Sequence, residues 1–421
     1  MSLSTAPYSQ GRAWLTAIVG LVTAIVLSFI YASISCSMDL LMENFDIGPA
    51  AAGWLITGCY LVSVVLALPG GVLIDKFGPL WVGLVGIAIS IVGTILGCFA
   101  TDYVFLMVTR VIQGVGPALV AIAVPTVISA WFSSAKRGPA MTLFSLWQSI
   151  GIFIVFAAAA YLLIPDDVTS WHNMWYLTLA GEVVVGILYA LVIRMPSERQ
   201  DLDEVEAEDS SETKGSMLEG FKSVATWALA LAFACWAVLA DTFINFTPLY
   251  CIEVLGLDSA VANADASLIS IGMIVGGLVM TPILGLVKKF SQRMIFLLVG
   301  EVVLTCISFM MFGYDEAMAI PYMVATGTIM MIIPAICFTV SPDTALKPIY
   351  LGVTMGIFAL AQNLGLGAAI AGTFLESFGW GNMAIFTTIV GAILIISSSI
   401  VFVTMKQRAA KAAAQPSASD I

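Results

Sequence analysis

Long apolar runs alternate with short polar breaks along the whole chain. A membrane-spanning helix needs about 20 consecutive apolar residues, and each run is about that long. The runs are continuous rather than alternating, so they predict helices and not barrel strands. We find twelve runs, at residues 14–38, 50–74, 80–100, 103–131, 139–164, 174–194, 224–250, 264–287, 294–313, 319–341, 351–374 and 382–404. The pattern therefore predicts an all-α integral membrane protein with twelve transmembrane helices.

Composition agrees with lipid as the main solvent of the chain. Of the 421 residues, 60% are hydrophobic and only 10% are charged, and the mean hydropathy is +1.02. A soluble protein of this size needs more polar surface than that. The formal net charge of −11 does not suggest a nucleic-acid partner.

The distribution of basic residues predicts the orientation. If both termini are cytoplasmic, 15 of the 16 Lys and Arg residues fall in cytoplasmic segments and the outer loops hold none. This is the asymmetry that the positive-inside rule describes. We expect a multi-pass protein of the cytoplasmic, or inner, membrane with both termini inside the cell.

A polar segment divides the chain in the middle. Residues 198–212 contain eight acidic side chains and almost no apolar ones, which is typical of a solvated tether. We therefore expect an N-terminal six-helix bundle over residues 1–194 and an acidic cytoplasmic linker over 195–223. After the linker we expect a second six-helix bundle over 224–405 and a cytoplasmic tail over 406–421.

Internal repeats support this division. The sequence after the second run, residues 69–78, is similar to residues 282–291 at an offset of 213. Residues 138–151 are similar to residues 352–365 at an offset of 214. Two matches at nearly the same offset predict two related halves, with a binding site where they meet near the middle of the membrane.

Three short motifs resemble the signatures of the major facilitator superfamily. The first is the loop between the second and third runs, in which Pro79 and Leu80 replace the usual basic pair. The second lies in the fourth run and the third in the loop that follows it. The matching residues are Gly71, Leu73, Asp75, Lys76 and Gly78, then Arg110, Gln113, Gly114 and Gly116, then Trp131, Phe132, Arg137, Gly138 and Ala140.

This resemblance implies two pseudo-symmetric six-helix bundles that expose a central cavity to each side of the membrane in turn. It also implies a cytoplasmic gate in which the first loop acts as a latch in the outward-facing state. The gate residues are then Gly71, Asp75, Lys76, Gly78 and Arg137. We expect the two glycines to allow close approach of a neighbouring helix, and Asp75 to pair with a helix end or a cation.

Four ionisable residues lie in the interior of the runs, away from their ends, namely Arg110, Glu182, Asp241 and Glu301. Such groups are costly in a membrane and usually pair, bind protons or line a cavity. Arg110 and Asp241 lie at similar depth in the outer half of the membrane. The resemblance places their helices around the cavity, so the two charges are expected to face each other across the halves. Glu182 and Glu301 lie on peripheral helices, either as structural acids or as coupling residues.

Several neutral side chains complete the candidate site. Gln113 shares a helix face with Arg110, and Asn245 lies one turn beyond Asp241. Gln148 and Gln362 are equivalent in the repeat, near the middle of the membrane, and Asn363 follows the second. These amides either bind substrate or join packed helices. The aromatic residues that could form cavity walls are Tyr31, Trp54, Tyr60, Trp147, Trp236, Phe243 and Phe246.

The sequence offers little for catalysis or cofactor binding. Its seven cysteines lie in or beside apolar runs without metal-site spacing, and His172 is the single histidine. No phosphate-binding loop of the Gly-x-x-x-x-Gly-Lys-Ser/Thr type occurs. We expect no enzymatic activity, cofactor or metal.

The leading hypothesis is a secondary transporter for a small organic metabolite, a monocarboxylate or another small polar solute, coupled to protons or to exchange. A proton-coupled efflux antiporter is the alternative, although the fifth run lacks the Gly-Pro element that many such exporters carry. A non-transporting sensor is the third hypothesis. The expected partners are the solute, protons and the lipid bilayer, and the expected state is a monomer.

Overall fold

The computed structural model describes residues 5–132, 140–141, 143–164, 167–196, 217–287, 289–310, 312–347, 350, 353–354, 357–358, 360–361 and 365–414. Helices dominate this part of the chain. In the first bundle the elements are β1 (Thr5–Ala6), α1 (Gln10–Leu27), α2 (Phe29–Cys36), α3 (Met38–Phe45), α4 (Pro49–Phe77), α5 (Pro79–Gly97), α6 (Tyr103–Gln113), α7 (Val115–Trp131), α9 (Trp147–Leu162), η1 (Val168–Trp171), α10 (His172–Val192) and β2 (Met195–Pro196).

The second bundle follows the acidic segment. Its elements are η3 (Met217–Lys222), α11 (Val224–Glu253), α12 (Ser259–Leu286), α13 (Phe290–Ser308), α14 (Glu316–Val340), η4 (Ser341–Thr344), α16 (Gly367–Phe378), η6 (Trp380–Asn382) and α17 (Met383–Ala414).

The helices match the apolar runs of the sequence. Within the described residues, 11 helical segments are long and apolar enough to cross a membrane, and each coincides with one expected run. The remaining run, 351–374, lies partly outside the described residues, and α16 covers its second part. The helical membrane fold is thus confirmed, and the twelfth span stays a prediction.

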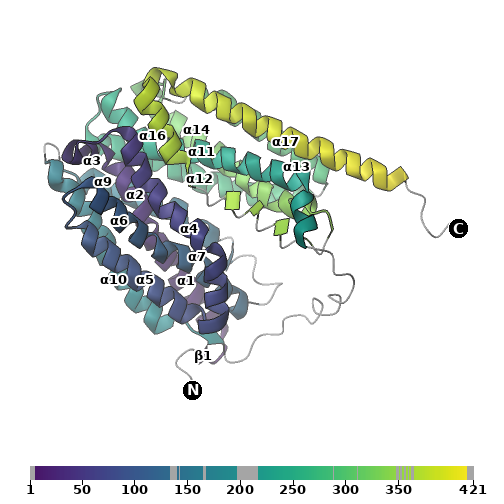
Figure 1. Ribbon diagram of the computed structural model, residues 1–421, viewed down its shortest axis with the longest axis horizontal. Helices are drawn as coiled ribbons and strands as arrows, with labels where there is room; N and C mark the ends of the chain where they lie inside the picture. Colours follow the sequence, from purple (N-terminus) through teal and green to yellow (C-terminus); the bar gives the residue numbers. More distant parts are fainter. Residues whose placement is uncertain are drawn as a thin grey trace.

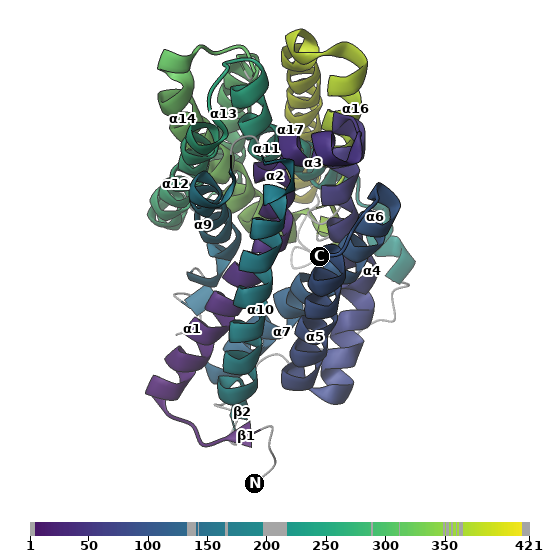
Figure 2. The ribbon, with the colours of Figure 1, turned by 90° about the vertical axis from the view of Figure 1, so that its left-hand side faces the viewer.

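The first bundle is tied together at the end where the chain begins. β1 pairs in parallel with β2, so residues 5–6 lie beside residues 195–196. Figure 2 shows α1, α10 and α5 running side by side toward these strands, and α10 packs against both other helices. We call this end of the molecule the inner end and the opposite end the outer end.

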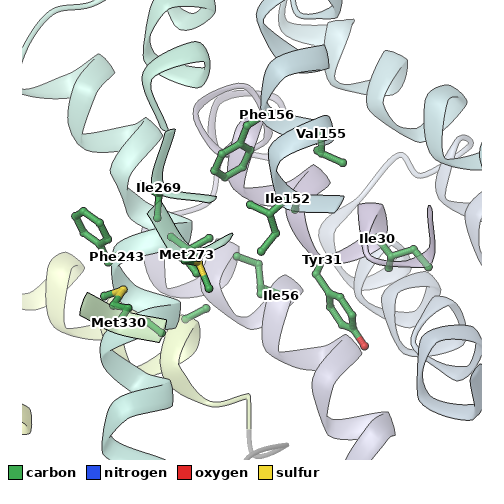
Figure 3. Close-up of a cluster of buried hydrophobic side chains, with 14 of the residues drawn as sticks. Ile30, Tyr31, Ile56, Ile152, Val155, Phe156, Phe243, Ile269, Met273 and Met330 are labelled. Carbon is green, nitrogen blue, oxygen red and sulfur yellow. The ribbon is translucent and has the colours of Figure 1, made fainter. Parts of the chain in front are cut away.

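The two bundles touch mainly through three helix pairs, α4 with α16, α9 with α12, and α2 with α11. Small residues allow the closest approach. Gly372 of α16 faces the carbonyl oxygen of Pro49, and Gly53 of α4 faces the carbonyl oxygen of Ala368, so closely that a Cβ at either glycine would clash. Apolar side chains fill the space around these contacts. Figure 3 shows Ile56, Ile152 and Met273, which come from α4, α9 and α12.

Hydrogen bonds between the bundles gather near the outer end. In the described part of the chain they join residues 35–57 of the first bundle to residues 245–376 of the second. The pairs are Ser35 with Asn245, Cys36 with Asn263, Ala50 with Glu376, and Thr57 with both Gly365 and Ala369. We call these contacts the outer seal. Figure 1 shows the bundles meeting near α3 and α16 and diverging toward the chain termini, so the structure is closed at its outer end.

Candidate functional site

A cavity of about 360 Å³ lies between the bundles, on the inner side of the outer seal. Both bundles contribute to its wall, as the repeat in the sequence predicts. The lining residues are Tyr31, Tyr60, Ser63, Ala67, Pro117, Ala118, Ala121, Ile122, Phe144, Trp147, Gln148, Ile152, Trp236, Ala237, Ala240, Asp241, Ile244, Met273 and Gly365.

Aromatic side chains form much of this wall. The rings of Tyr31 and Tyr60 are stacked, with centroids 4.2 Å apart and planes inclined by 13°. Trp236 donates its indole N–H to the carbonyl oxygen of Met330 at 2.8 Å. That bond fixes the ring against α14, and the ring lines the cavity from the second bundle.

Gln148 lies in the cavity wall, where a substrate-binding amide would have to lie. The sequence allows this role or a role in joining packed helices. Its Nε2 donates to the hydroxyl oxygen of Tyr60 at 3.0 Å. Both residues belong to the first bundle, so this bond joins α9 to α4. Gln148 is only partly buried, and its amide oxygen has no hydrogen-bond partner within the described residues. Because none of the described residues uses this acceptor, Gln148 is able to bind a solute from the cavity.

Asp241 is the one charged residue among the described residues that line the cavity. Its carboxylate accepts a hydrogen bond from the backbone N–H of Gly367. Gly367 is the first residue of α16, and a Cβ added there would lie 2.7 Å from Asp241 Oδ2. The negative carboxylate therefore lies at a helix N-terminus, where the peptide dipoles favour an anion. The side chain is partly exposed, so it stays accessible from the cavity.

Asn245, one turn beyond Asp241, belongs to the outer seal rather than to the cavity wall. Its Oδ1 accepts a hydrogen bond from Ser35 Oγ at 2.5 Å, and its Nδ2 donates to the carbonyl oxygen of Asp241 at 2.7 Å. The structure thus places Asn245 between the acid and the contact that closes the outer end.

Arg110 lies away from the cavity, inside the first bundle and fully buried. Its Nε donates to the carbonyl oxygen of Leu55 at 3.1 Å. One terminal nitrogen donates to the carbonyl oxygen of Ile30 at 2.6 Å, and the other to Gln113 Oε1 at 2.6 Å. The guanidinium also lies 5.9 Å from the ring of Trp175.

These contacts do not bring Arg110 to Asp241, and the pairing expected from the sequence is absent in this conformation. Arg110 instead joins three helices of one bundle, because the carbonyl oxygens it binds lie on α2 and α4. Gln113 continues the network, since its Nε2 donates to Thr94 Oγ1 at 3.1 Å. The sequence predicts the depth of Arg110 in the membrane but not the direction of its side chain.

The two remaining intramembrane acids each bind one serine within their own bundle. Ser90 Oγ donates to Glu182 Oε1 at 2.6 Å, which joins α5 to α10. Ser398 Oγ donates to Glu301 Oε1 at 2.5 Å, which joins α17 to α13. Both carboxyl groups are fully buried, and the second oxygen of each has no hydrogen-bond partner among the described residues. Neither acid lines the cavity.

The candidate gate residues lie at the inner end, where the bundles diverge. Gly78 has a φ of 81° and ends α4, a conformation that favours glycine. A Cβ at Gly71 or at Gly78 would meet nothing within 4 Å, so the close approach of a neighbouring helix expected at these two glycines is wrong. Asp75 and Lys76 are exposed, and Asp75 has no hydrogen-bond or ion-pair partner within the described residues.

Three of the expected site residues, Arg137, Gln362 and Asn363, lie outside the described residues. The aromatic candidates divide into two groups. Tyr31, Tyr60, Trp147 and Trp236 line the cavity. Trp54, Phe243 and Phe246 do not, because Phe243 and Phe246 are buried in the core and Trp54 lines an outward groove beside α16.

Sequence reasoning missed the role of Gly365. This residue lines the cavity with a φ of 55°, immediately before α16, and lies so close to Tyr60 that a Cβ would clash. Its carbonyl oxygen accepts from Thr57 Oγ1 at 2.9 Å. The repeat contained a signal, since Gly365 aligns with Gly151, which also packs too closely on Ser28 to carry a Cβ.

A sequence profile described as the Major Facilitator Superfamily matches residues 16–369. That match covers most of the chain, namely the first bundle and the greater part of the second. The chain belongs to the major facilitator superfamily. Members of this superfamily are membrane transporters, so the expectations of a transporter family and of a protein that is not an enzyme are confirmed.

Individual relatives are more distant. The chain is 23% identical over 440 residues to the probable galactarate/D-glucarate transporter GudP of Escherichia coli, and the alignment covers 94% of each chain. It is 28% identical over 167 residues to the lincomycin resistance protein LmrB of Listeria monocytogenes, which covers 39% of this chain and 34% of that protein. The chain aligns with only 29% to 39% of the length of five such curated relatives.

A solved structure confirms the fold. The crystal structure of a bacterial homologue of the human lysosomal transporter Spinster, inward-facing and unoccupied, superposes with a TM-score of 0.72. The sequence identity is 16%, and the superposition covers 94% of this chain and 98% of that one. At this identity the likeness establishes the fold alone.

Proposed function

We propose that this protein is a secondary transporter that moves a small organic solute across the cytoplasmic membrane by alternating access. The observation that carries the proposal is the cavity itself. Its wall comes from both bundles, and it lies directly inside a seal of contacts between them. Repeated bundles of this kind bind solute at their interface and rock around it.

Opening of the outer end requires separation of the outer seal. The seal consists of a few hydrogen bonds, of helix contacts at glycines and of the apolar side chains packed around them. A typical hydrogen bond contributes about 1 kcal/mol net, so each polar contact of the seal costs little to break when solute or proton binding changes. This supports exchange between an arrangement that is closed at the outer end and one that is open there.

Asp241 is the candidate coupling residue. A carboxylate that lines a cavity within the membrane can bind a proton from either side as access alternates. Its bond to Gly367 connects it to α16, which forms the seal with α4. We therefore propose coupling to protons at Asp241, with solute exchange as the alternative.

The lining changes the expected solute. The sequence suggests a monocarboxylate or another small polar solute, and the lining favours the second. Asp241 would repel a carboxylate, and no basic side chain among the described lining residues would attract one. Relatives of this chain include proteins named for sugar-acid transport and for lincomycin resistance, so the proposal covers uptake and efflux alike.

Solute counterflow in proteoliposomes tests the proposal. A transporter exchanges labelled solute for unlabelled solute inside the vesicles, whereas a sensor does not. Gln148→Ala should raise the solute concentration needed for half-maximal counterflow about tenfold, with the melting temperature unchanged. Gln292→Ala is the matched control, because Gln292 is exposed at the inner end of α13. Lack of counterflow for every solute that stabilises the protein would contradict the transporter proposal.

A further inference from the structure

The charge of the cavity is negative and is not balanced by any basic group of the membrane region. Arg110 is the single Lys or Arg in the interior of the apolar runs, because Arg194 stands at the end of its run. Its three guanidinium nitrogens already donate to Leu55, Ile30 and Gln113, and the side chain is fully buried. An anion in the cavity would therefore face Asp241 without a compensating cation, which is unfavourable in a site of low dielectric.

Asp241 retains capacity to bind a ligand. A carboxylate can accept about four hydrogen bonds, and the described bond to Gly367 uses one of them. The side chain is partly exposed to the cavity. An ammonium group that approaches from the cavity can therefore reach a carboxylate oxygen without breaking the contact with α16.

The aromatic wall suits the rest of such a ligand. Tyr60 and Tyr31 present stacked rings, and Trp147 and Trp236 add two indoles to the same cavity. Aromatic faces attract organic cations, and they also pack against aromatic or aliphatic bodies. The uncharged polar groups, those of Gln148 and Ser63, can orient a ligand but do not add charge.

The size and the charge limit the ligand further. Cavities that hold small molecules range from about 300 to 1,000 Å³, and the value of about 360 Å³ lies near the lower limit. One carboxylate balances one positive charge. We infer that the solute of the central cavity is a monovalent organic cation with a compact aromatic or apolar body, held between Asp241 and the Tyr31–Tyr60 wall. This inference rests on the proposed function, because it takes the cavity as the transport site.

Three probes of similar shape and different charge test the inference. They are benzyltrimethylammonium, benzyl alcohol and benzoate, each titrated onto the purified full-length protein in detergent by calorimetry. We expect the cation to bind at least tenfold more tightly than the alcohol, and benzoate to bind more weakly than both. If the cation binds no more tightly than benzyl alcohol, or does not bind at all, the inference is overturned.

Variants locate the preference at Asp241. Asp241→Asn should remove the tenfold advantage of the cation and leave the affinity for benzyl alcohol within about twofold. Asp343→Asn, at an exposed acid of η4 near the inner end, should change neither value. A cation advantage that persists in Asp241→Asn would overturn the assignment. If Asp241→Asn cannot be purified, Asp241→Glu should keep the cation preference, and its loss there would count against a charge-based site.

Counterflow separates this inference from the proposed function. If vesicles exchange labelled benzoate and not the cation, the protein is a transporter and the cation inference is wrong. If the cation binds at Asp241 but no probe is exchanged by any vesicle preparation, the transporter proposal fails instead, and the ligand chemistry of the cavity stands.

Discussion

The carboxylate of Asp241 accepts a hydrogen bond from the backbone N–H of Gly367, where α16 begins. One of these residues lines the cavity, and the other starts the helix that closes the outer end against α4. A proton or cation that neutralises Asp241 weakens its attraction for the helix N-terminus. Occupancy of the cavity is thereby connected to the outer seal through a single contact.

Asp241→Asn tests this connection. The amide oxygen can still accept from Gly367, but the charge is lost, which removes about 0.3–1 kcal/mol of interaction with the helix dipole. We expect proton-driven accumulation in vesicles to be abolished and thermal stability to change little. Asp343→Asn serves as the control. Normal accumulation by Asp241→Asn would exclude this residue as the coupling site.

Gly372→Ala should favour opening of the outer end. The new Cβ would collide with the carbonyl oxygen of Pro49 when the seal is closed, whereas an open outer end would accommodate it. Cys36 provides a native reporter, because it is buried in the seal. We expect its labelling by a membrane-impermeant maleimide, followed by mass spectrometry, to rise at least fivefold.

Gly381→Ala is the matched control for this experiment, since a Cβ there meets nothing within 4 Å. It should leave the labelling of Cys36 unchanged. Equal labelling in Gly372→Ala and the control, with both proteins folded, would show that the α4–α16 contact does not limit opening.

The sequence predicted the helices well and the site only in part, and the difference has a physical cause. Burial in lipid requires a long apolar run, which is visible residue by residue. The direction of a side chain depends on neighbouring helices, which one sequence does not show. In the structure Asp241 and Gln148 line the cavity, whereas Arg110 turns into its own bundle and Asn245 into the seal. Gly71 carried a family motif but has open space around it.

Glu301 and Glu182 should behave as structural acids. Glu301→Ala leaves a gap and an unpaired Ser398 hydroxyl inside the second bundle, which should cost about 2–4 kcal/mol of stability. Glu301→Gln keeps an acceptor for Ser398 and should retain transport. Thermal melting and counterflow measure the two effects, and Glu43→Ala, at an exposed acid of α3, is the control. Loss of proton-driven accumulation in a stable Glu301→Gln protein would instead assign this acid to coupling.

Asp75→Asn tests the proposed inner latch. Asp75 is exposed and has no partner among the described residues in this conformation, so the substitution should change stability by less than about 0.5 kcal/mol. A latch that forms only when the inner end closes predicts slower counterflow, by about fivefold or more, together with increased labelling of cysteines introduced at the inner end. Asp343→Asn, also an exposed acid at that end, should leave both unchanged. Normal counterflow by Asp75→Asn would remove the latch.

A double-mutant cycle of Arg110 and Asp241 tests whether the two charges interact, as the sequence suggests, or act independently, as their contacts in the structure indicate. Arg110 donates to Ile30, Leu55 and Gln113 in one bundle, while Asp241 binds Gly367 in the other, so they share no partner. Arg110→Gln should lower stability by about 3–5 kcal/mol, because three buried acceptors lose a charged donor. Its effect should add to that of Asp241→Asn within about 0.5 kcal/mol. Rescue of Arg110→Gln by Asp241→Asn, in melting temperature or in counterflow, would show that the two charges meet in another conformation. Arg110→Lys extends the test, because it keeps the same charge. One ammonium group cannot reach acceptors on α2, α4 and α6 together. The melting temperature of this variant should therefore be lower than that of the native protein.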